Sequence, residues 1–261
     1  MSEDSLNRRS GTQSYRQLPW LRVLVEGVVI VGSILLAFGI DAWWDDKQRR
    51  GEEQLVLESV LQEFESIRSN YSQDRLAADA IRESILQLLR ISADPEPEVT
   101  NQNIDKLLAD LTWSIPVTNY SAPVLTSVIS NGDSSLISNP TLRLELGGWP
   151  VRLDNVARFL DRDSNELVGR YLPYLERNGS LLQIVNAVDC KPGLPNHCWD
   201  YGDRIYPESL HDHSDLMSDM DFQGLLSIRL IVMSDVIEFA FSDLEIELSS
   251  TIEMLEHEMA N

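Results

Sequence analysis

The first apolar run of the chain is long enough to cross a membrane. Residues 21–40 read LRVLVEGVVIVGSILLAFGI, and their last fourteen carry no charge. A helix needs about 20 predominantly apolar residues to span a bilayer. Trp20 precedes the run and Trp43-Trp44 follow it, as aromatic residues do at the two membrane interfaces. The pattern predicts one transmembrane helix over residues 21–44, which makes the lipid bilayer the first expected partner.

We expect this segment to remain as an anchor, because no small-residue cleavage site of the kind that follows a signal peptide comes after it. A buried core helix is the alternative, since Arg22 and Glu26 lie inside the run. Four basic residues precede or enter the span and three follow it, and basic residues favour the cytoplasmic side. We therefore predict a cytoplasmic tail over residues 1–20 and a periplasmic domain over residues 45–261.

The polar and small residues of the span gather on one side of the predicted helix. At 100° per residue, Arg22, Glu26, Ser33, Ala37 and Asp41 fall within about 100° of arc. Charged residues at membrane depth usually face protein or water, and the Ser33-to-Ala37 spacing allows two helices to approach closely. We predict that Glu26, Ser33, Ala37 and Asp41 contact another transmembrane helix, from a second copy or a different protein. Alternatively, Arg22 and Glu26 pair with each other near the interface.

Helical spacing of apolar residues continues beyond the span. No Gly or Pro occurs between Glu52 and Asp94, and Pro95 and Pro97 then end the pattern. One helix is therefore predicted from about residue 20 to residue 92. The apolar residues at spacings of three, four or seven are Leu57, Leu61, Phe64, Tyr71, Ala78, Ile81, Ile85 and Leu88.

Turn and cap residues divide the next part of the chain into short helices. One is predicted from Ile104 to Trp113, with Asn101 or Asn103 as its N-cap. Another begins near Ser121 with a proline in its first turn, and Asn131-Gly132 closes it.

Two further long helices are predicted in the second half of the chain. Asn139-Pro140 begins the first, which Gly147-Gly148 and Pro150 are expected to kink or break before it resumes as far as Asn178-Gly179. The second covers about Phe222 to Met259 and carries one apolar stripe.

Residues 189–213 between these helices are expected to form an irregular loop, and no convincing alternating strand pattern occurs. The expected fold is all-α, with a transmembrane helix that continues into a long helix and a helical bundle.

The charge of the chain is concentrated after the membrane segment. Residues 1–50 hold 7 Lys/Arg and 6 Asp/Glu, whereas residues 51–261 hold 14 and 36, a balance of -22. Nucleic-acid binding rests on Lys and Arg that neutralise phosphate. An acidic domain of this kind excludes a nucleic-acid partner.

Two stretches resemble a family of uncharacterised bacterial single-span membrane proteins. Residues 28–44, VVIVGSILLAFGIDAWW, match its S-I-L-L-A-F-like span, and residues 131–137, NGDSSLI, with Leu142-Arg143 match a turn in its helical domain. Gly147-Gly148 and the cysteine loop depart from the family's pattern. The resemblance implies an inner-membrane location and no known activity.

Few residues suggest chemistry. His211 and His213 stand among carboxylates and could hold a transition metal. A calcium loop beginning at Asp161 fails, because Glu166 replaces the required Gly and Leu172 the bidentate Glu. The sequence contains no nucleophile elbow, phosphate-binding Gly-rich loop or His-Glu-x-x-His. We therefore predict no catalytic residue and no cofactor.

Three functions fit these features. A membrane-anchored interaction or assembly module agrees with the polar face of the span and needs no active site. An extracytoplasmic ligand sensor would hold a small molecule between helices and act through a signalling partner. A metal-dependent enzyme would use His211 and His213. We favour the first.

The two cysteines of the chain, Cys190 and Cys198, bracket the loop KPGLPNH. The spacing suits a local disulfide, and two free thiols are the alternative. A zinc site is less favoured, because structural zinc usually has four ligands and only His197 lies nearby in sequence.

We predict that Cys190 and Cys198 are bridged in the native protein, because disulfides persist in the periplasm. In the chain-entropy model the bridge would stabilise the fold by about 2–3 kcal/mol. Thiol alkylation without reductant, on protein isolated from its own membrane, should leave both cysteines unmodified. Quantitative alkylation of both would contradict the prediction.

Overall fold

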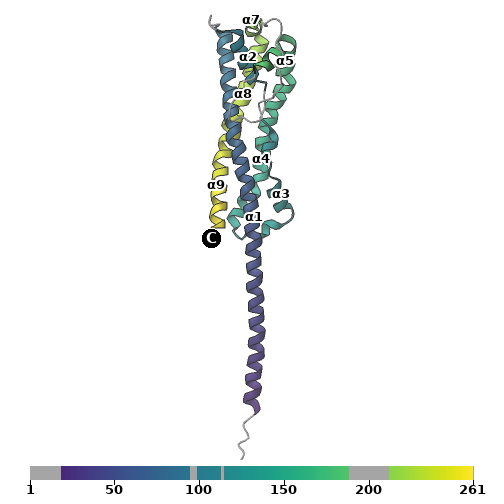
Figure 1. Ribbon diagram of the computed structural model, residues 1–261, viewed down its shortest axis with the longest axis vertical. Helices are drawn as coiled ribbons and strands as arrows, with labels where there is room; N and C mark the ends of the chain where they lie inside the picture. The colour runs from purple at the N-terminus through teal and green to yellow at the C-terminus, as the bar shows by residue number, and fades with distance from the viewer. Residues whose placement is uncertain (1–18, 95–98, 113–114, 188–211, 261) are drawn as a thin grey trace, which may run out of the picture. The chain divides into compact units, whose positions relative to one another are not determined.

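The computed structural model describes residues 19–94, 99–112, 115–187 and 212–260 (Figure 1). All regular structure within these ranges is helical, which confirms the all-α prediction. The chain divides into two compact units, Met1–Glu52 and Glu53–Asn261. The predicted loop at 189–213 lies almost wholly outside the described residues, and Cys190, Cys198 and His211 lie there with it.

Helix α1 covers Pro19–Ala93 and confirms the predicted long helix. Its positions beyond Glu53 supply one side of the core of the second unit. The buried residues recur every three or four positions, as expected for one helical face. They include Leu57, Val60, Phe64, Ile67, Tyr71, Ala78, Ile81, Ile85 and Leu88.

Residues 101–138 run back along α1. They form α2 (Asn101–Asp110), η1 (Val117–Asn119), α3 (Pro123–Ser130) and η2 (Asp133–Leu136). Hydrogen bonds to α1 give the direction, since the partner on α1 moves toward the N-terminus as this segment advances. The pairs are Asp110 with Ser84, Asn119 with Asp74, Val124 with Glu63, and Ser138 with Glu53.

The third segment is a nearly continuous helical stretch. It comprises α4 (Pro140–Glu166), the π-helix η3 (Leu167–Tyr171) and α5 (Leu172–Asn178), and the short α6 (Leu181–Asn186) follows. The predicted end at Asn178-Gly179 is confirmed. A break at Gly147-Gly148 and Pro150 is absent, because α4 runs through all three residues.

Tertiary contacts around Trp149 hold this part of α4 helical. The indole is fully buried, lies edge-on to Phe64 with 4.7 Å between ring centroids, and donates a 3.0 Å hydrogen bond to Thr251 Oγ1. Pro150 has no backbone N–H, so the helix lacks one hydrogen bond there. The contacts of Trp149 offset the free energy that this missing bond costs.

The last segment follows α7 (Ser214–Ser218) and consists of α8 (Met220–Asp235), the π-helix η4 (Val236–Phe241) and α9 (Ser242–Met259). The predicted apolar stripe is buried from Met233 to Leu255, but the π-helical turn was not predicted. This segment runs antiparallel to α4, as four contacts show. They join Asn139 to Glu258, Trp149 to Thr251, Arg152 to Glu247, and Arg162 to Asp235.

The second unit is therefore an up-down-up-down helical bundle in which the second segment is broken into short helices. Within this unit, Figure 1 shows α9 and α4 alongside the upper part of α1. Aromatic contacts join the segments at the centre, for example Tyr71 edge-on to Phe241, with 5.6 Å between ring centroids.

The helix caps partly follow the sequence signals. Asn139 caps α4 by accepting from the backbone N–H groups of Thr141 and Leu142, as predicted. Gly132 has a φ of 82°, the left-handed conformation that favours glycine after a helix. The predicted caps of α2 were wrong. Thr100 takes this position, because its backbone is extended and its hydroxyl accepts from the N–H of Asn103.

Helix α3 receives its cap from another segment. Ala122 at its N-cap has no side chain that could accept a hydrogen bond, whereas both carboxylate oxygens of Glu63 do so. Glu63 Oε1 accepts from Val124 N at 2.8 Å and Oε2 from Leu125 N at 2.9 Å. The carboxylate also lies at the positive end of the helix dipole.

We predict that Glu63→Ala lowers the free energy of unfolding by about 1–2 kcal/mol, because α3 loses its N-terminal acceptor. Chemical denaturation of the detergent-solubilised chain, followed by circular dichroism, measures the change. Glu65→Ala is the matched control. Glu65 is an exposed glutamate on the same helix whose carboxylate forms an ion pair with Arg68, at 3.9 Å. Equal stability of the two variants would refute the capping role.

Candidate functional site

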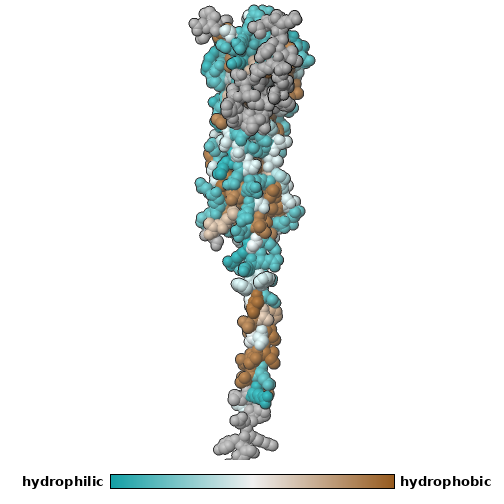
Figure 2. Space-filling model, viewed as in Figure 1, coloured by the Kyte–Doolittle hydropathy of each residue, from teal (hydrophilic) through white to brown (hydrophobic). Residues whose placement is uncertain are grey.

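One segment of the first unit has the length and composition of a membrane span. Helix α1 contains an apolar stretch that could cross a bilayer, and none of this stretch is buried in the structure. Figure 2 shows it as a run of hydrophobic residues with a hydrophilic end. The large apolar side chains of this stretch are exposed, and those of Val28, Leu35 and Phe38 are 62%, 65% and 66% exposed. Such a surface needs a partner, and a bilayer would provide it.

The predicted contact residues Glu26, Ser33, Ala37 and Asp41 are all exposed on this helix. The hydroxyl of Ser33 donates to the carbonyl of Val29 at 2.7 Å, so it disturbs the span little and still offers acceptor lone pairs. Helical geometry also places Ile30 within the same arc, so that the face is a mixed stripe of polar, small and apolar residues.

The charged end of this stripe has a local partner. Arg22 Nε lies 3.7 Å from Glu26 Oε1, one helical turn away, and both side chains are exposed. This pair agrees with the alternative in which the two residues neutralise each other near the interface. Ser33, Ala37 and Asp41 are then the contact residues that this ion pair does not involve.

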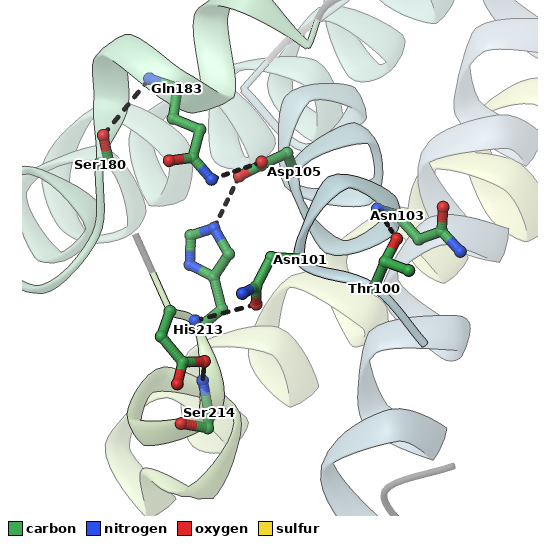
Figure 3. Close-up of polar contacts among 9 residues, drawn as sticks. Thr100, Asn101, Asn103, Asp105, Ser180, Gln183, His213 and Ser214 are labelled. Atoms are coloured by element: carbon green, nitrogen blue, oxygen red, sulfur yellow. Dashed lines mark hydrogen bonds and ion pairs between the residues drawn. The ribbon is translucent and has the colours of Figure 1, made fainter. Parts of the chain in front are cut away.

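The second unit holds a buried polar cluster around Asp105, shown in Figure 3. Asp105 lies on α2, Gln183 on α6, and His213 immediately before α7. Asp105 Oδ1 is 2.6 Å from Nε2 of His213, and Asp105 Oδ2 accepts from Nε2 of Gln183, also at 2.6 Å. The three side chains are at most 5% exposed. One carboxylate therefore joins three separate pieces of the chain.

Helix termini explain why polar residues meet here. Ser180 caps α6 by accepting from the backbone N–H of Gln183 at 3.4 Å. Asn101, at the start of α2, accepts from the backbone N–H of His213 at 3.2 Å. Asp212 accepts from Ser214 N at 3.0 Å, and this hydrogen bond lowers the pKa of the Asp212 carboxyl from its ordinary value. The cluster thus fixes the ends of three helices at one point.

The His213–Asp105 pair has the geometry by which a carboxylate orients an imidazole in acid–base catalysis. However, the imidazole has no exposed surface, so no substrate can approach it in this arrangement. We interpret the pair as a structural contact. As for metal binding by His211 and His213, no group of three or more His, Cys, Asp or Glu side chains that could hold a metal occurs in the described ranges, and His211 lies outside them.

A second buried cluster joins α4, η3 and α8. Arg229 Nε lies 3.5 Å from Asp163 Oδ1, and both side chains are only 1% exposed. Another guanidinium nitrogen of Arg229 donates to the carbonyl of Leu111, and the guanidinium carbon lies 5.3 Å from the centre of the Tyr171 ring. Burial raises the pKa of Asp163 above its ordinary value, while Arg229 opposes this shift. Asp163 therefore serves the core and not a calcium site.

Sequence reasoning missed these buried polar residues, although a signal was present. Asp163 lies three positions after Leu160 and four before Leu167, in the middle of a buried stripe. Arg229 likewise lies three positions after Leu226 and three before Val232. A single charge in an apolar helical stripe indicates a buried ion pair, but its partner cannot be identified from spacing alone.

Comparisons with family models, with curated proteins and with solved structures found no match to this chain. The function therefore has to follow from its own residues and their geometry.

We predict that Asp105→Ala lowers the free energy of unfolding by about 1–3 kcal/mol, because buried groups of His213 and Gln183 lose their acceptor. A double-mutant cycle with His213→Ala should be non-additive, since the second substitution removes a group already deprived of its partner. Chemical denaturation provides the values. Gln102→Ala, an exposed change on the same helix, is the control. Additive effects would show that the two residues do not interact.

Proposed function

We propose that this protein is a membrane-anchored helical assembly module of the bacterial inner membrane. In this proposal residues 21–44 span the bilayer once, and Glu26, Ser33, Ala37 and Asp41 contact another transmembrane helix. The observation that supports it most is the fully exposed apolar stretch of α1, which carries polar and small residues on one side.

The energetics of a bilayer favour a protein partner for this face. A carboxylate exposed to lipid costs ~2.5 kcal/mol or more at the centre of a span and less near its ends, where Glu26 and Asp41 lie, whereas a neighbouring helix can supply a hydrogen-bond donor. Ser33 and Ala37 are small enough to let two backbones approach. The gain per interhelical hydrogen bond is modest, about 1 kcal/mol, so that association would be reversible.

Charge distribution supports the proposed orientation. The basic residues around the span slightly favour a cytoplasmic tail, and the unit beyond it is strongly acidic. An acidic unit is repelled by anionic headgroups, so it is expected not to lie on the membrane surface. A periplasmic location of residues 53–261 agrees with the bias of the basic residues.

We predict that a photo-crosslinking residue at Ile30, within the same arc, captures a second transmembrane helix in native membranes. Replacing Ser33 and Ala37 by Leu should reduce the captured product several-fold without preventing insertion, because the larger side chains keep the backbones apart. Gel electrophoresis and mass spectrometry measure the yield and identify the product.

Val28→Leu with Val31→Leu is the matched control, since it adds bulk outside the arc. If neither the Ser33 and Ala37 double substitution nor Glu26→Leu changes the yield, the polar face is not a contact surface and the span is a plain anchor.

A further inference from the structure

A groove of about 560 Å³ lies on the outer surface of the second unit, between α4 on one side and η4 with α9 on the other. Its two walls have opposite charge. Among the residues that line the groove, α4 contributes three arginines and no acid, whereas α9 contributes two acids and no base. The arginines are Arg152, Arg158 and Arg162, and the acids are Asp243 and Glu247.

The groove also exposes apolar side chains. Phe239, in the π-helix η4, lines it with 60% of its surface exposed, and Phe159 lies opposite on α4. Val151 on α4 and Ile246 on α9 do not line the groove itself, but they lie on the helices that form its walls and are 64% and 71% exposed. Together with the charges, these residues give the mixture of apolar and polar groups that protein interfaces contain.

Two of the charged residues are available to a partner. Arg152 pairs within the chain with Glu145 and Glu247, and Arg162 pairs with Asp235 at 3.0 Å. Among the described residues Arg158 pairs only with Asp154 on its own helix, and this exposed pair contributes little. Asp243 forms no ion pair within the part of the chain that the structure describes.

Helix direction places these two charges at nearly the same level. Because α4 and α9 are antiparallel and Arg152 meets Glu247, Asp243 lies level with about residue 156. Arg158 is two residues further along α4, or roughly 3 Å at 1.5 Å per residue. If two copies are related by a two-fold axis parallel to these helices, each residue keeps its height along the axis. The α4 wall of each copy then lies opposite the α9 wall of the other. Arg158 of each copy would then face Asp243 of the other.

We propose that this groove is the contact surface for a second copy of the same chain. The α4 wall of one copy packs against the α9 wall of the other, and Phe239 enters the groove of the partner. This is an isologous interface, since each copy contributes the same patch. The inference rests on the proposed assembly function and extends it to the second unit.

The size of the patch indicates a weak contact. From Val151 to Arg162 the face is about 18 Å long, and two adjacent helices are roughly 20 Å wide. Two such faces would bury about 700 Å² in total, below the 1,200–2,000 Å² of stable complexes. Anchoring in one membrane compensates, because it raises the effective concentration of the two copies. The full chain in a membrane is therefore the form to test.

A photo-crosslinking residue at Phe239 of the full chain, in its own membrane, tests the contact. We expect a covalent dimer whose crosslinked peptide contains residues 151–162 of the second copy. Arg158→Glu and Asp243→Arg should each reduce the dimer yield about tenfold. The two-fold dimer contains two contacts between positions 158 and 243, and either substitution gives both contacts like charges.

Co-expression of the two variants with different tags gives the decisive measurement. In a mixed pair Glu at position 158 faces Arg at position 243, and the unchanged Asp243 faces the unchanged Arg158. Mixed dimers should therefore return to the wild-type yield while each variant alone remains low. Arg177→Glu with Glu256→Arg, exposed changes outside the groove, is the matched control and should have no effect.

Crosslinks confined to one chain, or to a different protein, would overturn the inference, as would mixed dimers no more abundant than those of either variant alone. Circular dichroism of each variant verifies folding, and recovery in the mixed pair itself requires folded chains. Loss of the Ile30 crosslink with retention of the Phe239 crosslink would refute the membrane contact alone. The reverse result would refute the groove alone.

Discussion

The apolar stripe of α1 between Leu57 and Leu88 is the constraint on which the second unit depends. Each of the other three segments has one apolar side, and each buries it against this stripe or its neighbours. Phe64 meets Trp149 of the third segment, and Tyr71 meets Phe241 of the fourth. Burying a large apolar side chain contributes about 1.5–3 kcal/mol, so the stripe supplies much of the driving force for folding.

Hydrophobic burial is non-directional, and polar contacts therefore set the register. Four side chains on α1, at positions 53, 63, 74 and 84, each bind a defined point of the descending segment 101–138. One of them, Asp74, is buried, and burying its charged carboxylate costs free energy. Burial raises the pKa of Asp74, so its contribution to stability is fully present below the ordinary carboxyl pKa and is lost as the pH rises through the raised value. Hydrogen bonds from Asn119 and Tyr120 reduce this cost.

The sequence predicted the features that depend on local pattern. Helical spacing revealed α1 and the last segment, Asn139 correctly marked the start of α4, and Gly132 correctly marked the end of α3. Pro150 does not break α4, because the contacts of Trp149 override a local preference. The π-helices η3 and η4 have no local signature, and the partners Asp105 and His213 are 108 positions apart. The proposed contact face of the span rests on helical geometry alone, because its residues are exposed in the structure.

In the proposed assembly, the charge of the chain gives the membrane anchor a specific role. Residues 51–261 carry 14 basic and 36 acidic residues, a balance of -22, so two free copies of this unit repel each other. Salt screens this repulsion beyond about 8 Å at physiological ionic strength, whereas oppositely charged groups in direct contact interact at shorter range. A complementary pair such as Arg158 and Asp243 can therefore act only after the copies have been brought together. A span that associates reversibly with another span would bring them within this distance, so the two proposed contact surfaces would act one after the other.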